Sequence, residues 1–177
     1  MKFDNALVQT RVPSPLGTII IAASAKGLAG LWFLEGQRYL PPELSTPAAS
    51  PGWPEDASHT LLKETGQQLA DYFAGKRRHF DVPLDLASGT AFQQSVWQAL
   101  LHIPPGGTQS YGEVSRLIGQ PGAVRAVGAA VGRNPISIIV PCHRVMGANG
   151  ALTGYAGGLA RKTALLRLEG VLQEVLV

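Results

Sequence analysis

The sequence predicts an α+β fold in which a small antiparallel sheet with one helix precedes a mostly helical region. Three observations predict it. The first third holds short apolar, β-branched segments joined by tight turns, the second half holds helical periodicity between glycine and proline breaks, and no internal repeat is present. With 177 residues and 45% hydrophobic content, the chain can form one large domain or two small ones. We expect domains over residues 1–85 and 86–177.

The expected strands cover residues 6–12, 18–23 and 28–34. A proline-rich turn over residues 13–17 separates the first two strands, and Ala25-Lys26-Gly27 separates the second and third. Five prolines within residues 41–54 predict an exposed loop. A helix should follow, capped by Ser58 and ended by Gly75. Its apolar side would be formed by Leu61, Leu62, Leu69, Tyr72 and Phe73.

In the second half we expect helices over residues 92–101, 111–118, 123–132 and 159–169. Ser110 followed three residues later by Glu113 forms a capping box at the start of the second of these helices. The second and third helices flank a glycine-containing turn, which is the helix-turn-helix pattern. That pattern alone is weak, because many helical hairpins share it and bind nothing. Residues 136–140 are nearly all apolar and predict a buried strand.

The helix expected over residues 123–132 is nearly free of bulky side chains. Two glycines in a helix cost roughly 1 kcal/mol each relative to alanine, so a close approach should offset that cost. The approach could be to another helix in the core or to a groove of DNA, and spacing alone favours the core. The small residues are Ala123, Ala126, Gly128, Ala129, Ala130 and Gly132.

Charge is distributed unevenly along the chain. Residues 1–89 hold eight Lys/Arg and nine Asp/Glu, a net charge of −1, whereas residues 90–177 hold seven Lys/Arg and three Asp/Glu, a net charge of +4. This asymmetry points to a polyanion contact by the second half, although a solvated basic face would give the same count. No apolar run is long enough to cross a bilayer, and the N-terminus does not resemble a secretory signal. We therefore expect no membrane association.

The only cysteine, Cys142, lies in the segment Pro141-Cys142-His143-Arg144-Val145. A lone cysteine is most often a small buried hydrophobic residue, and it fits a reducing, cytoplasmic location. His143 could take the thiol proton, and Arg144 adds positive potential that favours a thiolate. These neighbours make Cys142 a candidate nucleophile.

Metal and phosphate sites are not expected. The one cysteine and four histidines show no ligand spacing, and no glycine-rich loop with a lysine is present. We therefore expect no metal and no cofactor.

The Cys142 segment closely resembles the O6-alkylguanine-DNA alkyltransferase family, in particular its constitutive bacterial members. The resemblance runs from residue 90 to residue 170. It includes Phe92-Gln93, Tyr111-Gly112-Glu113, Arg125-Ala126-Val127-Gly128, Asn134-Pro135 and Gly154-Tyr155-Ala156-Gly157-Gly158. Residues 1–85 match only loosely. The resemblance implies a ribonuclease-H-like first domain and a second domain with a winged-helix-like helix-turn-helix that binds DNA and accepts the alkyl group.

The resemblance also implies roles for individual residues. Cys142 would accept the alkyl group, His143 would act as its base through a water, and Glu169 would orient that histidine. Asn134 would tie the active-site turn to the recognition helix. Tyr111 would crowd the 3′ phosphate and hydrogen-bond the leaving guanine.

Further residues would contact DNA and the base. Arg125 would replace the extruded base in the stack, and the small helix would enter the minor groove of double-stranded DNA. By position, the expected DNA-binding residues are Arg125, Ala126, Gly128 and Arg133. The residues expected to line the base pocket are Val145, Tyr155, Ala156 and Gly157.

The implied reaction is repair of O6-alkylguanine, with O4-alkylthymine as a second expected substrate. A thioether product offers water no electrophilic carbonyl, so each molecule should act once as a suicide methyltransferase. We expect a monomer; cooperativity on DNA stays open. Three other functions compete with this one: a non-enzymatic binder of alkylated guanine, a cysteine hydrolase that turns over, and a transcription factor. The presence of Cys142 argues against the binder, and the basic helix-turn-helix has no role in a hydrolase.

Overall fold

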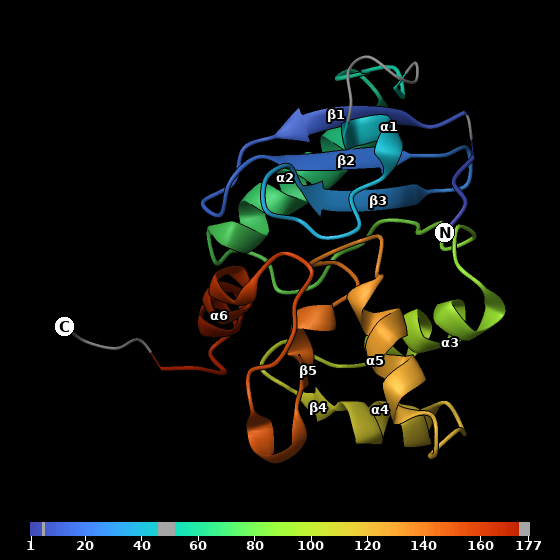
Figure 1. Ribbon diagram of the computed structural model, residues 1–177. Coiled ribbons are helices and arrows are strands. Elements are labelled where there is room, and N and C mark those ends of the chain that lie inside the picture. Colours follow the sequence, from blue (N-terminus) through green and yellow to red (C-terminus); the bar gives the residue numbers. More distant parts are fainter. Residues whose placement is uncertain (5, 46–51, 174–177) are drawn as a thin grey trace. The chain divides into compact units, whose positions relative to one another are not determined.

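The computed structural model describes residues 1–4, 6–45 and 52–173 (Figure 1). The chain folds as two compact units, Met1–Gly89 and Thr90–Val177. The α+β class is confirmed: a small antiparallel sheet belongs to the first unit and a mostly helical arrangement to the second.

The sheet of the first unit has the order β1-β2-β3, with β1 at Val8–Val12, β2 at Ile19–Ala23 and β3 at Leu28–Phe33. Both pairings are antiparallel, and a register shift lies between Ala22 and Ala23. All residues of β2 and β3 are buried, so both faces of these strands are covered. The three expected strands are therefore present, each one or two residues shorter than predicted at its ends.

Helix α2, Thr60–Phe73, packs against β1 and β2 (Figure 1). The predicted apolar side holds for Leu62, Leu69 and Tyr72, which are buried. The predicted cap is wrong: His59 precedes the helix without a side-chain cap, and Ser58 Oγ instead donates to Oδ1 of Asp56 at 2.7 Å. Gly75 adopts a φ of 74° just after the helix, which is the left-handed conformation that ends helices.

The proline-rich segment is not wholly a loop. Residues Pro42–Ser45 form the short helix α1, and Trp53 is buried in a cluster with Leu7 and Trp32. The rest of that prediction, residues 46–51, lies outside the described residues. Residues 83–85 bond to Leu28 through its N–H and C=O, so this segment belongs to the first unit.

The helices of the second unit match the predicted ones to within one or two residues. They are α3 at Ala91–Leu100, α4 at Tyr111–Leu117, α5 at Val124–Gly132 and α6 at Leu159–Leu168. Ser110 and Glu113 form the predicted capping box, with Ser110 Oγ accepting from the Glu113 N–H at 3.1 Å. Thr90 and Gln93 form a second one at α3.

Helices α4 and α5 pack together, and both contact α3. The Trp97 indole N–H, on α3, donates to the Ala130 carbonyl of α5 at 2.8 Å in the buried core. A two-stranded parallel ladder pairs β4, Gln109–Ser110, with β5, Val145–Met146. This ladder brings the start of α4 next to the segment that follows Cys142.

The strand predicted over residues 136–140 is wrong. The segment is buried but forms turns, with Ile139 N–H bonded to the Ser137 carbonyl and Val140 N–H bonded to the Ile136 carbonyl. Ile138 has a φ of 71°, which is a strained conformation for a β-branched residue. Apolar composition reports burial, and it does not distinguish a strand from a buried turn.

Candidate active site

Asn134 organises the buried turn that leads to Cys142. Its Oδ1 accepts from the Ile136 N–H at 2.9 Å, and its Nδ2 donates to the Val140 carbonyl at 2.7 Å. The same amide nitrogen lies 3.1 Å from Sγ of Cys142. Asn134 therefore satisfies the backbone of the turn and contacts the sulfur at once.

Cys142 begins a short 3₁₀ helix, Cys142–Arg144, and is 4% exposed. Burial raises the pKa of its thiol, while the Asn134 amide and the Lys162 ammonium act in the opposite direction. The neutral thiol is thus the resting form, and a base is needed to generate the thiolate.

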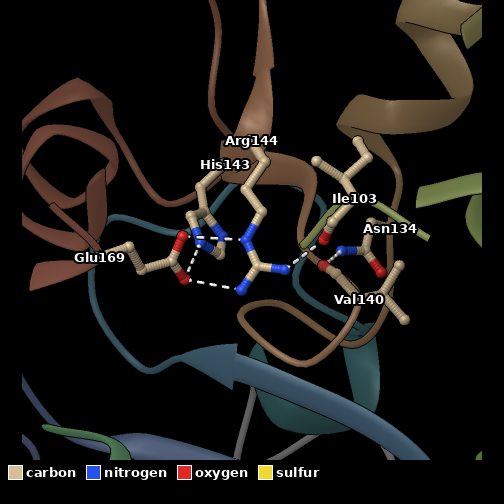
Figure 2. A network of polar contacts seen from close by, with 6 residues as sticks. All are labelled: Ile103, Asn134, Val140, His143, Arg144 and Glu169. Atoms are coloured by element: carbon tan, nitrogen blue, oxygen red, sulfur yellow. Dashed lines mark hydrogen bonds and ion pairs between the residues drawn. The ribbon is translucent and has the colours of Figure 1, made fainter. Parts of the chain in front are cut away.

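His143 and Arg144 both bind Glu169, the residue that follows the last turn of α6 (Figure 2). His143 Nε2 lies 2.8 Å from Oε1 of Glu169. Arg144 donates through Nε to Oε2 at 2.9 Å and through NH2 to Oε1 at 2.8 Å. The third guanidinium nitrogen donates to the Ile103 carbonyl at 2.6 Å, which completes the network.

The protonation states of this network follow from its geometry. Burial alone would raise the pKa of Glu169, but the hydrogen bonds from His143 and Arg144 lower it to about 2. Burial lowers the pKa of His143, against the pull of the carboxylate. An ionised Glu169 can only accept, so neutral His143 carries its proton on Nε2. Its Nδ1 is then a lone-pair base, and it is buried with no hydrogen-bond partner among the described residues.

The cation near the thiol differs from the predicted one. Arg144 is bound to Glu169 and Ile103, and the Glu169 carboxylate offsets its charge. The buried Lys162 of α6 supplies that positive charge instead. The sequence did not single out Lys162, because α6 carries several basic residues and only tertiary packing shows which of them is buried. The available signal was the place of this lysine on the apolar side of the helix.

Tyr111, the first residue of α4, lies close to two glycines, the predicted DNA-binding residue Gly128 and Gly154 of the loop before Tyr155. A Cβ added at Gly128 would lie 3.8 Å from its ring, and one added at Gly154 would lie 3.9 Å from its hydroxyl. Val145, Tyr155, Ala156 and Gly157, the predicted pocket residues, are all buried. The structure therefore places Tyr111 between α5 and the loop that leads to Tyr155.

One face of α5 is exposed and carries the predicted DNA-binding residues. Arg125 and Ala126 are exposed, as is Arg133 just after the helix. A Cβ added at Gly132 would meet nothing within 4 Å, and one at Gly128 would make only ordinary contacts. Internal packing therefore does not require glycine at these two positions. The spacing of the small residues alone had favoured close packing against another helix in the core.

Within residues 1–4, 6–45 and 52–173, no group of three or more His, Cys, Asp or Glu side chains could hold a metal ion. Among the same residues, no helix is both long and apolar enough to span a membrane.

Two family models match the chain, one for each unit. Residues 7–86 match the "6-O-methylguanine DNA methyltransferase, ribonuclease-like domain", and residues 91–171 match the "6-O-methylguanine DNA methyltransferase, DNA binding domain".

Individual relatives match over most of their length. A Mycobacterium tuberculosis protein named methylated-DNA–protein-cysteine methyltransferase is 51% identical over 158 residues, which cover 89% of each chain. A protein of the same name from Methanosarcina acetivorans is 49% identical over 157 residues, which cover 89% of this chain and 94% of the relative. A crystal structure described as Mycobacterium tuberculosis OGT in complex with DNA is 49% identical, covers 92% of both chains and has a TM-score of 0.79.

Proposed function

The chain belongs to the 6-O-methylguanine DNA methyltransferase family, and on that premise we propose that it repairs alkylated DNA by moving the alkyl group from guanine O6 to Cys142. The activity is that of a methylated-DNA–protein-cysteine methyltransferase. The observation that carries the assignment to Cys142 is the buried site itself: the sulfur bonded by Asn134, followed directly by a histidine that Glu169 orients.

The proposed step uses each group of that site once. The thiol proton passes through a water to Nδ1 of His143, and the thiolate attacks the alkyl carbon in line with the carbon–O6 bond. The new bond is Sγ–C. The electron pair of the broken bond leaves with the guanine, whose developing charge is stabilised by hydrogen bonds from Tyr111 and the Ala156 N–H.

Protonated His143 would remain paired with Glu169, whose charge Arg144 holds in place. The product is a neutral thioether, which lacks the electrophilic carbonyl that lets water regenerate a cysteine hydrolase. Each molecule therefore acts once and is consumed.

The finer parts of the proposal concern DNA. Arg125 and the exposed, small-residue face of α5 would enter the minor groove, with the alkylated base extruded into a pocket lined by Val145, Tyr155 and Gly157. The space beside Gly128 and Gly132 supports a close approach by a partner. O4-alkylthymine is proposed as a second substrate, and a monomer as the acting form.

The test is intact-mass spectrometry after incubation with an excess of an O6-methylguanine duplex. The wild-type protein should gain one methyl group and stop, and the Cys142→Ser variant should gain none. Repeated turnover by one molecule, or a methyl group on the serine variant, would contradict the proposal. The same assay with an O4-methylthymine duplex tests the second substrate, and sedimentation without DNA tests the monomer.

A further inference from the structure

Lys162 is a charged residue in the core of the second unit that the proposed reaction does not use. It lies on α6 and is 0% exposed. Its ammonium donates to three carbonyl groups: Val145 at 2.6 Å, Thr153 at 2.7 Å and Gly154 at 3.4 Å.

These carbonyls lie at the two ends of one loop. Val145 is three residues after Cys142, and Gly154 directly precedes Tyr155, which is one of the residues of the predicted base pocket. Between them, residues 148–154 are exposed, and the loop closes on itself through the Gly147 N–H and the Ala151 carbonyl at 2.8 Å. The ammonium therefore links the two ends of a loop whose middle residues are exposed.

Burying this charge costs free energy because the ammonium loses its hydration. An apolar side chain would fill the same space without that cost. Burial lowers the pKa of Lys162 to about 8, so its proton is held less firmly than in water. The three carbonyl bonds offset part of this cost. Among the described residues, an apolar side chain at position 162 would lose only these bonds and the electrostatic effect of the ammonium on the Cys142 thiol.

We infer that Lys162 is a positioning residue: it fixes the segment carrying the acceptor sulfur to the segment that receives the base. The distance between the two segments therefore stays the same when substrate enters. The inference rests on the proposed function. A displacement on the order of 1 Å between reacting atoms costs roughly 100-fold in rate, so a fixed spacing matters for an in-line attack.

The experiment compares Lys162→Met, which keeps the length and removes the ammonium, with wild type and Arg167→Met. Arg167 is exposed on the same helix, so its variant loses the same charge without touching the loop. Three quantities are measured: the Kd for an O6-methylguanine duplex, the single-turnover transfer rate at saturating duplex, and amide-hydrogen exchange over residues 147–154.

For Lys162→Met we expect a transfer rate lower by roughly 100-fold, a Kd changed by less than about threefold, and faster exchange over residues 147–154. Arg167→Met should transfer like wild type. The alkylation rate of Cys142 by iodoacetamide is also measured and extrapolated to the fully ionised thiol. This extrapolation corrects for any change in the thiol pKa caused by the lost charge, and the extrapolated rate in Lys162→Met should stay near that of wild type.

Wild-type transfer and exchange rates in Lys162→Met would overturn the inference, as would an iodoacetamide rate that falls as far as the transfer rate. If Lys162→Met does not fold, Lys162→Leu, which also removes the ammonium and leaves an apolar side chain in its place, is used in every comparison. A wild-type protein that accepts no alkyl group would instead reject the proposed function, so the two failures are distinguishable.

Discussion

The imidazole of His143 donates its Nε2–H to Oε1 of Glu169 across 2.8 Å, with both side chains buried. This bond decides which ring nitrogen can act as a base, because the ionised carboxylate can only accept. Nδ1 is left with its lone pair and without a partner among the described residues. The tautomer that the proposed transfer requires is therefore set before substrate binds.

Replacing Glu169 by glutamine should slow alkyl transfer by roughly tenfold or more, because the amide can donate to the ring and stabilise the wrong tautomer. It should also lower the free energy of unfolding by about 3–5 kcal/mol, since Arg144 is left buried without its counter-ion. Single-turnover rates and urea unfolding measure the two effects. Glu64→Gln, an exposed change in the first unit, is the control. An unchanged transfer rate in Glu169→Gln would show that the carboxylate does not orient the base.

Acid should destabilise the protein in two steps. The pKa of buried His143 lies below its ordinary 6.5, so the unfolded chain takes up a proton that the folded chain refuses as the pH falls below 6.5. The pKa of Glu169 falls from 4.5 to about 2 on folding, so its contribution, on the order of 3 kcal/mol, is complete above pH 4.5 and is lost as the pH falls toward 2. Urea unfolding over this range measures both steps. In Glu169→Gln the second step should be smaller, and an equal loss in both proteins would refute its assignment.

Alanine at Gly128 or Gly132 should stabilise the protein and weaken DNA binding. Each change raises helix propensity by about 1 kcal/mol, and the structure leaves room for the new methyl group at both positions. The methyl groups would hinder the approach of a groove to α5. Thermal unfolding and fluorescence-anisotropy titration with duplex DNA measure the two effects, and transfer from free O6-alkylguanine base is the control. Stabilised variants that bind DNA like wild type would leave the glycines without a role at the DNA surface.

Arg125→Ala should slow transfer from duplex DNA by roughly 10- to 100-fold, because extrusion of a base costs a few kcal/mol and an intercalated side chain recovers part of it. Transfer from the free base, which needs no extrusion, should not change. Arg125 is exposed on α5, so the protein should unfold at the wild-type temperature. Equal losses on duplex and free base would place the effect in the pocket instead of the helix.

The sequence determined the features that depend on neighbours along the chain. The turn signals located the three strands, and the Ser110–Glu113 pair located the start of α4, because both depend on bonds within a few residues. The adjacency of Cys142 and His143 predicted a nucleophile and its base for the same reason. The motif resemblance identified the family, which two domain models confirm.

Tertiary structure decided which charges act on which atoms. From sequence, Arg144 was as good a partner for the sulfur as any cation, yet the fold commits it to Glu169, 25 residues away, and brings Lys162 to the buried site. Likewise, the apolar run at residues 136–140 predicted a strand, whereas Asn134 bonds it into a turn that holds Ile138 at a φ of 71°. Burial and side-chain hydrogen bonds set these outcomes, and the spacing of apolar and charged residues along the chain does not specify either.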